Sequence, residues 1–330
     1  MLHSHLTTLN AVSLILDTFR AEGISTPALL SGSGIEEADL ARPDLHITTA
    51  QEMQVCANAY ALRDNIGLEL GARMHVSSYG MLGYALLLSA TFGDALTFAL
   101  RYPALLGTLF ELRLEEDGDL VWLRASNYTD RPALAVFNAE LCMASLRVIC
   151  NDVLGQPLPL KEAHFSHALP HYADDYQQAF NCPLRFGCTD NAFAFDREWL
   201  AKPLPLADAV THGAMAERCR RQNSEFTGRQ AWLGRIRQAL AQQLHAPPGL
   251  EGLARQMKCS GRTLRRRLQD VGSSYQDLLD DLRFEQAKYL LVEARLPVYR
   301  IAEQLGFSET ASFRHAFIRW SGVSPSAFRA

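Results

Sequence analysis

The sequence predicts two folded parts, an α+β domain over residues 1–205 and an all-α domain over residues 246–330 with two helix-turn-helix units joined by a connecting helix. Segments in which apolar and polar residues alternate, which indicate strands, lie in the first part. In the second part, the segment LARQMKCS recurs 48 residues later as IAEQLGFS. The sign of the net charge also differs between the two parts.

Charge is divided unevenly along the chain. Residues 229–330 contain 16 Lys and Arg against 9 Asp and Glu, a net of +7, whereas residues 1–228 contain 16 against 27, a net of −11. A basic domain in an acidic protein points to a nucleic-acid partner, although many moderately basic domains of this size have none. Charge alone therefore leaves the partner of the C-terminal part open.

Length and composition place the chain among globular proteins. Its 330 residues, 48% of them apolar, are enough to bury a sizeable core. The longest near-apolar run, Tyr79–Ala90, is shorter than the ~20 residues of a membrane-spanning helix, and no basic region precedes the first apolar stretch. Seven cysteines without a CxxC pair fit reduced thiols. We expect a cytoplasmic protein with no membrane partner.

Helices are predicted for most of the first 106 residues. An amphipathic stretch covers Leu6–Ala21, and the capping-box sequence Thr49-Ala-Gln-Glu52 begins a second helix that continues to Leu62. Residues Tyr79–Leu106 have the same helical pattern. The first domain is therefore expected to begin with packed helices.

A β-hairpin is predicted next, in the segment LFELRLEEDGDLVWLRA. Phe110, Leu112 and Leu114 alternate with charged residues, and Asp117-Gly118 is a favoured two-residue hairpin turn. A helix over Pro132–Leu154 is expected to follow this hairpin.

The rest of the first domain is predicted to consist of short elements. We expect a strand over Ala163–Ser166, a helix over Tyr172–Phe180 and a second hairpin in LRFGCTDNAFAF. The domain then has about five short strands mixed with helices, which is typical of an α+β fold.

The strongest candidate for a catalytic or metal site is the cluster HFSHALPH. Residues three apart on a strand point to opposite faces, and Pro170 prevents one helix from aligning the three histidines, His164, His167 and His171. Zinc needs three or four converging ligands, so we expect no metal site. The chain also lacks GxSxG, HExxH, phosphate-loop and dinucleotide motifs. We therefore expect no catalytic residue and no cofactor, and a binding protein rather than an enzyme.

Residues 206–245 are predicted to form a helical linker. Pro203-Leu-Pro205 ends the first domain, and Leu206–Leu244 has a helical pattern in which the polar segment RRQNSEFTGRQ suggests a hinge. His245-Ala-Pro-Pro-Gly249 is the strongest break in the chain, and the segments after it are short and helical.

The segment SGRTLRRRL gathers four arginines in nine residues. On a helix, Leu264 and Leu268 share one side, and the arginines occupy the other sides. Ser260 is a candidate N-cap, and a short helix over Leu250–Met257 precedes it. Two helices joined by a tight turn, the second with an exposed cationic face, form a helix-turn-helix. The alternative is an ordinary solvated surface helix, because Arg also favours helices.

A second copy of the pattern favours the helix-turn-helix interpretation. IAEQLGFS is followed by ETASFRHAFIRW, in which Phe313 and Phe317 take the places of the leucine pair. Between the copies, Tyr275–Ala294 is predicted to be one connecting helix that ends before Pro297. At 1.5 Å per residue it spans about 30 Å, close to the ~34 Å of one DNA turn. The two recognition helices are therefore expected to enter successive major grooves.

These motifs resemble those of the AraC/XylS family of transcriptional regulators. IAEQLGFSETASFRHAFIRWSGVSPSAFR is similar to the family's second helix-turn-helix, and CSGRTLRRRLQDVGSSYQDLL is similar to its first. Residues 1–205 resemble the N-terminal region of the family branch with an arabinose-binding-like domain. The segments that carry this second resemblance are YGMLGYALLLSATFGDAL, FSHALPHYADDYQQAFNCPLRFG, NAFAFD and WLAKPLPLAD.

The resemblance implies a sequence-specific regulator of promoter DNA, usually an activator that recruits RNA polymerase. Its N-terminal domain would sense a small-molecule effector, form a homodimer, or both. The acidic domain favours a cationic ligand such as a basic amino acid, whereas its many apolar residues equally suit an apolar acid. The alternative function is a metabolite-binding protein or enzyme whose basic C-terminal domain contacts another partner.

The resemblance also assigns roles to residues of both recognition helices. Base contacts fall on exposed residues early in each helix, namely Arg262, Arg265, Arg266, Thr310, Ala311, Arg314 and His315. Phosphate contacts fall on Ser260, Thr263, Arg267, Ser308 and Arg319, with capped helix starts at Ser260 and Ser308. Arg bound to guanine is the commonest specific contact, so the first helix is expected to read G-containing steps.

Three positions depart from the family pattern. Lys258 stands at the turn where the second unit has Gly306, and a left-handed Lys costs about 1 kcal/mol. His315 replaces a common Arg, which weakens direct readout and adds pH sensitivity. Ile318 replaces a basic or polar residue and removes a possible phosphate contact.

Overall fold

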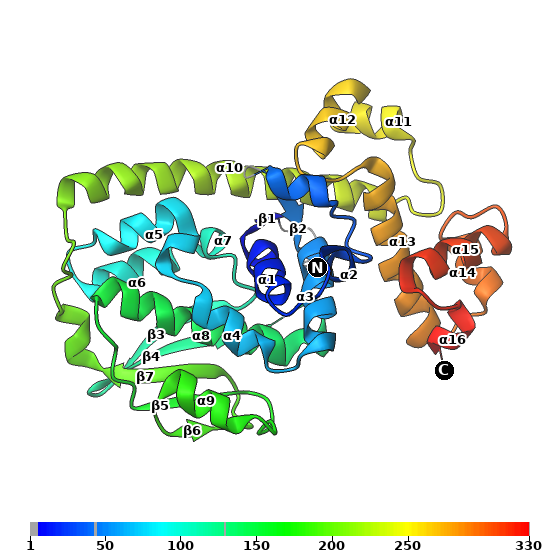
Figure 1. Ribbon diagram of the computed structural model, residues 1–330. Coiled ribbons are helices and arrows are strands. Elements are labelled where there is room, and N and C mark those ends of the chain that lie inside the picture. Colours follow the sequence, from blue (N-terminus) through cyan, green and yellow to red (C-terminus); the bar gives the residue numbers. More distant parts are fainter. Residues whose placement is uncertain (1–5, 43–44, 129, 330) are drawn as a thin grey trace. The chain divides into compact units, whose positions relative to one another are not determined.

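A computed structural model describes residues 6–42, 45–128 and 130–329 (Figure 1). These residues form two compact units. Unit 1 comprises residues 6–42 and 49–228, and unit 2 comprises residues 45–48 and 229–329. Each unit has its own buried apolar core.

The N-terminal part of unit 1 is mainly helical, as the sequence predicts. Its first elements are β1 (Leu6–Thr8), α1 (Asn10–Arg20), α2 (Thr26–Leu30), η1 (Glu37–Ala41), α3 (Thr49–Leu62), α4 (Ile66–Arg73), η2 (Val76–Tyr79), α5 (Gly80–Leu87), α6 (Phe92–Leu100) and α7 (Pro103–Leu106). The predicted first helix is confirmed but begins at Asn10, because residues 6–8 form a strand. The predicted helix from Thr49 to Leu62 is confirmed at both ends.

A five-stranded sheet follows these helices. Its strands are β3 (Glu111–Asp117), β4 (Leu120–Ser126), β5 (Glu162–His164), β6 (Leu184–Arg185) and β7 (Asn191–Asp196), in the spatial order β3-β4-β7-β5-β6. The predicted hairpin of β3 and β4 is confirmed, but its turn lies one residue later than predicted. Asp117 pairs with Leu120, so the loop residues are Gly118 and Asp119.

The predicted second hairpin, in LRFGCTDNAFAF, is wrong. Strand β5 lies between β6 and β7, pairing parallel with β6 and antiparallel with β7. The residues after β6 bond instead to the segment that follows β5. Gly187 N donates to His167 O, and Cys188 N donates to Phe165 O. A pairing between segments far apart in sequence has thus replaced the local one.

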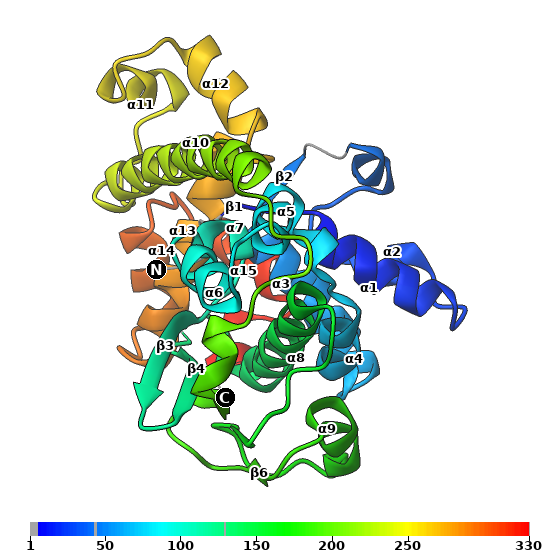
Figure 2. The ribbon, with the colours of Figure 1, turned by 90° about the vertical axis from the view of Figure 1, so that its left-hand side faces the viewer.

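Helix α8 (Ala135–Leu154), which follows the single turn η3 (Pro132–Leu134), forms the centre of unit 1. It packs between helix α4 and one face of the sheet (Figure 2). Phe193 and Phe195 of β7 and Met143 of α8 are fully buried members of one core. Helix α9 (Ala173–Phe180) and the turn η4 (Arg197–Ala201) complete the chain around this core.

One helical segment of the described residues, which contains α8, is long enough and apolar enough on average to pass a test for a membrane-spanning helix. By length and composition alone, Pro132–Leu154 is apolar enough to cross a membrane, with a mean hydropathy of 1.6. However, 61% of its apolar window is buried within the protein. Burial of this kind is expected for the core helix of a folded domain.

The seven cysteines are free thiols, as predicted. Cys56, Cys150, Cys182 and Cys219 are buried, and the others are partly buried. Burial raises the pKa of the Cys150 thiol to about 12. A thiol with a raised pKa stays protonated and unreactive at neutral pH.

A buried carboxylate joins α8 to α9. Glu140 of α8 is 0% exposed, and its Oε1 accepts hydrogen bonds from Tyr176 Oη at 2.6 Å and from Tyr172 Oη at 2.8 Å. Its Oε2 has no hydrogen-bond partner among the described residues. Burial raises the pKa of Glu140 to about 7, although the two tyrosine hydroxyl groups act in the opposite direction.

We expect Glu140 to make the free energy of unfolding fall as the pH rises from about 5 to 7.5. The folded-state pKa of about 7 exceeds the ordinary 4.5, so the folded state binds more protons in this window. A shift of this size corresponds to on the order of 3 kcal/mol. Urea unfolding across this window should show a flatter slope for Glu140→Gln. The exposed control Glu37→Gln should keep the wild-type slope, and equal slopes for wild type and Glu140→Gln would refute this expectation.

Helix α10 (Ala209–Ala241) occupies most of the predicted linker. The polar segment RRQNSEFTGRQ, Arg220–Gln230, is helical throughout, so the expected hinge is not a break in this helix. The division between the two compact units falls within this segment, between Gly228 and Arg229.

Unit 2 contains the two predicted helix-turn-helix units. Its helices are α11 (Leu250–Gln256), α12 (Gly261–Gln269), α13 (Tyr275–Val292), α14 (Val298–Gln304), α15 (Thr310–Ser321) and α16 (Pro325–Arg329), and the short strand β2 (His46–Thr48) is grouped with it. Helix α13 joins the pair α11–α12 to the pair α14–α15 (Figure 1). It ends two residues before the predicted end.

Candidate DNA-binding surface

The first helix-turn-helix consists of α11, a turn at Lys258 and α12. Lys258 has a φ of +52°, the left-handed conformation that Gly306 takes in the second unit. The predicted strained lysine is therefore confirmed. Ser260 caps α12, as predicted, because its Oγ accepts a hydrogen bond from Thr263 N at 3.1 Å. The two hydroxyl oxygens, Ser260 Oγ and Thr263 Oγ1, lie 2.8 Å apart.

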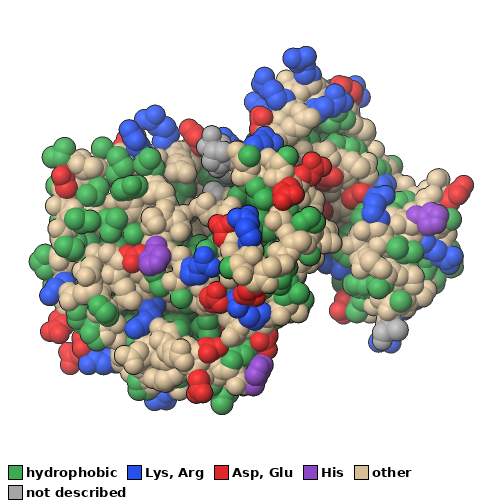
Figure 3. All heavy atoms as spheres, in the orientation of Figure 1, with side chains coloured by type: hydrophobic (Ala, Val, Ile, Leu, Met, Phe, Trp, Pro, Cys, Tyr) green, Lys and Arg blue, Asp and Glu red, His purple; other side chains and the backbone are tan. Residues whose placement is uncertain are grey.

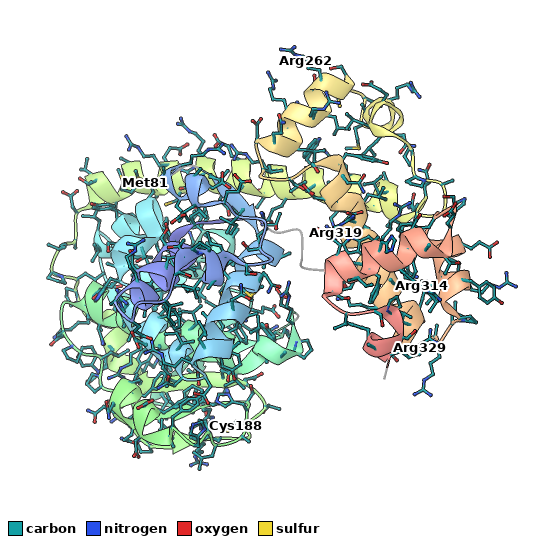
Figure 4. The ribbon with its side chains drawn as sticks, turned by 45° about the vertical axis from the view of Figure 1, so that its right-hand side comes forward. Met81, Cys188, Arg262, Arg314, Arg319 and Arg329 are labelled. Carbon is teal, nitrogen blue, oxygen red and sulfur yellow. The ribbon has the colours of Figure 1, made fainter. Side chains whose placement is uncertain are left out.

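The two sides of α12 differ as the helical pattern predicts. Leu264 and Leu268 are buried, at 0% and 1% exposed. The side chains of three arginines on the other sides are exposed and have no hydrogen bond or ion pair with another described residue, namely Arg262, Arg265 and Arg266. Lys and Arg side chains gather over α11 and α12 in Figure 3. Figure 4 shows Arg262 on the outer side of α12.

The fourth arginine of α12 contacts another helix of unit 2. The guanidinium carbon of Arg267 lies 5.9 Å from the ring centroid of Trp232, in the C-terminal part of α10. Such a cation–π contact contributes about 0.5–1 kcal/mol at an exposed site. Arg267 is thus positioned by Trp232, whereas the other three arginines of this helix extend into solvent.

The second recognition helix, α15, has an apolar side and an exposed side. Phe313 and Phe317 are fully buried, as the repeat predicts. The predicted base-contact residues Ala311, Arg314 and His315 are exposed. Thr310, the first residue of the helix, is partly buried.

The predicted cap of α15 at Ser308 is wrong. The N-cap residue is Glu309, which has an extended backbone and makes no side-chain capping hydrogen bond. Ser308 is exposed and precedes the cap by one residue. The helix therefore begins one residue later than its counterpart in the first unit, so the repeat in sequence is not an exact repeat of the capping geometry.

The turn of the second unit is held by the connecting helix. Arg283 of α13 donates hydrogen bonds to Leu305 O at 2.9 Å and to Gly306 O at 3.3 Å. Its guanidinium also lies over the ring of Phe307, 4.4 Å from the centroid. These contacts fix α14 and α15 to α13, and Arg283 is not among the residues predicted to be functional. The available signal was its spacing, because Arg283 lies four residues before Ala287 and seven before Leu290, on the apolar side of the connecting helix.

Arg319, at the C-terminal end of α15, is already paired. Its guanidinium donates to Asp280 Oδ2 of α13 at 2.6 Å. Asp280 also accepts a hydrogen bond from Gln276 at 2.8 Å. The Arg319 side chain is still 65% exposed, so it remains accessible while it is paired.

Helix α13 sets the spacing between the two recognition helices. It contains 18 residues, which span about 27 Å at 1.5 Å per residue. This length is somewhat shorter than one DNA turn of ~34 Å. Helix α13 also contacts the C-terminal part of α10, because Arg237 Nη1 lies 3.5 Å from Asp281 Oδ2.

The three histidines of HFSHALPH have separate partners in unit 1. His164 Nε2 lies 3.0 Å from Glu162 Oε2, and His167 Nε2 lies 2.7 Å from Tyr176 Oη. His171 Nε2 lies 3.5 Å from Asp64 Oδ2. Each imidazole therefore has its own neighbour.

Comparisons with known proteins address both parts of the chain. Residues 23–204 match the family described as the arabinose-binding domain of AraC transcription regulator, N-term, and residues 253–330 match a helix-turn-helix domain family. The chain is 34% identical to an ornithine utilization regulator of Pseudomonas aeruginosa, over 96% of this chain and 94% of that protein. It is 31% identical to the regulator VqsM of the same organism, over 80% of this chain and 83% of that protein.

Among solved structures, the transcriptional regulator CdpR from Pseudomonas aeruginosa matches with a TM-score of 0.49 and 24% identity, over 97% of this chain and 98% of that chain. The N-terminal family match and the full-length relatives agree with the double helix-turn-helix of unit 2 and its cationic recognition helix. The chain therefore belongs to the AraC family of DNA-binding transcriptional regulators.

Proposed function

We propose that this regulator is an activator whose affinity for promoter DNA or activity on it depends on a small-molecule effector. In this proposal, residues 1–205 bind the effector and form a homodimer, residues 206–245 link the domains, and residues 246–330 read DNA. The match to an arabinose-binding domain of AraC regulators supports a sensing role for the first domain.

The exposed arginine face of α12 is the observation that best supports the DNA-binding surface. Three arginine side chains of this short helix are exposed and have no hydrogen bond or ion pair with another described residue. Like charges three and four residues apart on a helix repel each other by about 0.2–0.5 kcal/mol, and a bound anion would remove this repulsion. DNA phosphates and the O6 and N7 atoms of guanine are suitable acceptors for guanidinium groups. We assign base contacts on this helix to Arg262, Arg265 and Arg266.

On the second recognition helix we assign base contacts to Thr310, Ala311, Arg314 and His315. Phosphate contacts are assigned to Ser260, Thr263, Arg267, Ser308 and Arg319. Two of these have competing partners, because Arg267 lies over Trp232 and Arg319 pairs with Asp280. Each chain would read two successive major grooves, with the first helix supplying most of the cationic contacts.

Dimerisation, recruitment of RNA polymerase and a cytoplasmic location are further parts of the proposal. Symmetric dimers are the commonest protein assemblies, and pairing would double the length of DNA that is contacted. We propose that the protein acts by binding and not by catalysis, because its relatives are regulators. The name of the ornithine utilization regulator supports a basic amino acid, rather than an apolar acid, as the class of effector.

Arg266→Ala and Arg319→Ala are expected to affect DNA binding differently. Loss of a base contact by Arg266→Ala should cost about 1–3 kcal/mol on the cognate site and relax base preference there. Loss of a phosphate contact by Arg319→Ala should weaken all sequences alike. The measurement is the affinity of the full chain for a site selected from random sequence and for random DNA, at one salt concentration.

Asp280→Asn provides the control for Arg319, because it removes the ion pair and keeps the arginine. Both Asp280→Asn and Arg319→Ala remove the ion pair between Arg319 and Asp280. If Arg319 binds phosphate, only Arg319→Ala should weaken DNA binding, because Asp280→Asn keeps the arginine. Equal losses on cognate and random DNA for Arg266→Ala would contradict its assignment to a base.

A further inference from the structure

Unit 1 contains a cavity of about 60 Å³ that lies outside the proposed DNA-binding surface. It is enclosed by α3, α8 and the segment that joins α7 to β3. Most of its wall consists of aliphatic, thioether and phenyl side chains, with Met53, Leu109, Leu141 and Ile149 among them. An apolar cavity with a few polar groups is the usual form of a small-molecule site.

Two titratable groups in this wall, a phenol and a thiol, stay neutral. Burial raises the pKa of Tyr79 to about 12, and it raises the pKa of the Cys142 thiol to about 11. Both shifts have the same cause, because surroundings of low polarity disfavour the charged form of a buried group. The wall is therefore an environment in which a charge is poorly solvated.

Glu52 is the one side chain with a formal charge among the described residues that line the cavity, and it is not available to a ligand. It is the fourth residue of the capping-box sequence at the start of α3, and it already interacts with another residue of the chain. Among the described residues, no Lys, Arg or His lines the cavity. The wall thus offers no free partner to an ammonium group or to a carboxylate.

The hydroxyl groups of the wall form hydrogen bonds within the protein. Ser145 Oγ donates to Cys142 O at 2.9 Å, and the hydroxyl of Tyr79 bonds to Ser145. Thr108 Oγ1 accepts from Phe110 N at 3.1 Å and lies 3.6 Å from Cys142 Sγ. These groups shape the wall and do not need a ligand.

The side-chain amide of Asn138 has an acceptor that is not used. Asn138 is 4% exposed, and its Nδ2 donates to Leu134 O and to Tyr128 Oη, both at 3.0 Å. Its Oδ1 accepts no hydrogen bond from a described residue, and unlike Glu140 Oε2 it is not sealed inside the protein. Because Asn138 is otherwise buried and lines the cavity, a donor can reach this oxygen from the cavity.

The volume limits the size of the ligand. A single water needs about 10–15 Å³ of such space, so about 60 Å³ accommodates roughly four to six groups of that size. An alcohol with a short alkyl chain has this size.

We propose that the cavity between α3 and α8 binds a small, neutral alcohol, with its alkyl chain among Met53, Leu141 and Ile149 and its hydroxyl group donating to Asn138 Oδ1. Burial of the alkyl chain supplies the affinity, and the unused acceptor selects a ligand with a donor. A basic amino acid, the proposed effector, carries charges that this wall cannot pair. The cavity is therefore a second ligand site, and the inference does not depend on the proposed effector response.

The test is calorimetric titration of the full chain with 1-butanol, 1-pentanol and 2-pentanol, and with 2-pentanone, n-butylamine and butyrate, up to about 10 mM. We expect at least one alcohol to bind. The ketone 2-pentanone has the size of 2-pentanol but no donor, and it should bind about 5-fold more weakly. The amine and the carboxylate should bind at least about 10-fold more weakly than 1-butanol, because their charge finds no free partner in the wall.

Three variants locate the site. Leu141→Phe should block alcohol binding by filling the cavity. Leu169→Phe is the matched control, because Leu169 is 64% exposed and does not line the cavity, and it should bind as wild type does. Asn138→Leu keeps an apolar wall and removes the acceptor, so it should lose the preference for 2-pentanol over 2-pentanone.

Four results would overturn the proposal. They are no alcohol binding up to this concentration, equal or tighter binding of the ketone, the amine or the carboxylate, wild-type affinity in Leu141→Phe, and an unchanged preference for 2-pentanol in Asn138→Leu. If Asn138→Leu does not fold, the wild-type panel and the two leucine variants decide.

Discussion

Gly306→Ala is expected to destabilise unit 2 by about 3 kcal/mol or more and to disable the second reading helix. Gly306 has a φ of +72°, and a Cβ there would lie 2.5 Å from His245 O and 2.8 Å from Leu244 O. A left-handed alanine alone costs about 1–2 kcal/mol. The two carbonyl groups belong to the backbone, so relieving the overlap requires the segment before α11 or the turn itself to move.

The measurement for Gly306→Ala is urea unfolding together with footprinting on the selected DNA site. Lys258→Gly is the matched variant, since Lys258 takes the same left-handed conformation in the first turn and is exposed. It should stabilise the first unit by about 1 kcal/mol, because glycine removes the strain. If Gly306→Ala has the free energy of unfolding of wild type and still protects two grooves, then a Cβ at this turn does not disturb the fold of the second helix-turn-helix, and the expectation is wrong.

Much of the architecture of unit 2 could be predicted because its signals are local. The spacing of Leu264 and Leu268, the cap at Ser260 and the repeated segment each act within one or two helical turns, and the structure confirms them. The left-handed Lys258 was predicted from its alignment with Gly306. The cap predicted at Ser308 was wrong because it was inferred from the similar segment that ends at Ser260, whereas the N-cap of α15 is Glu309.

Features that depend on long-range pairing could not be predicted from the sequence. Strands β6 and β7 have the pattern of a hairpin, but β5 lies between them. Strand β5 pairs with β6 on one side and with β7 on the other, so that β6 joins the sheet through β5. The contacts of Arg319 with Asp280 and of Arg267 with Trp232 join helices that are distant in the sequence. Helical periodicity identifies these arginines as exposed, but it does not indicate which side chain approaches them.

The connecting helix illustrates the same limit. From the sequence it is a spacer, whereas in the structure it supplies part of the core of the second helix-turn-helix. Arg283 holds the turn of that unit, and the ring of Phe284 lies 5.5 Å from that of Phe317. Further along α13, Ala287 and Leu291 belong to the same buried core. Side chains from both halves of α13 thus pack against α14 and α15.

Insertion of Ala-Ala between Glu285 and Gln286 is expected to remove the second reader altogether. At about 100° and 1.5 Å per residue, it would turn the residues after the insertion by about 200° and displace them by about 3 Å relative to those before it. If the second helix-turn-helix stayed folded, this rotation would only turn α15 away from the major groove. Because Arg283 and Ala287 lie on opposite sides of the insertion and contact the same unit, they cannot both keep their contacts.

We therefore expect footprinting of this insertion variant to show protection of one major groove per chain. Specific affinity should fall by at least about 30-fold, since two lost base contacts cost about 1–3 kcal/mol each. The free energy of unfolding should also fall, which distinguishes a lost core from a simple rotation. Gln286→Ala, an exposed substitution at the same place, should leave both readouts unchanged. A variant that protects two adjacent grooves with wild-type stability would show that α13 is a flexible linker and not a shared core element.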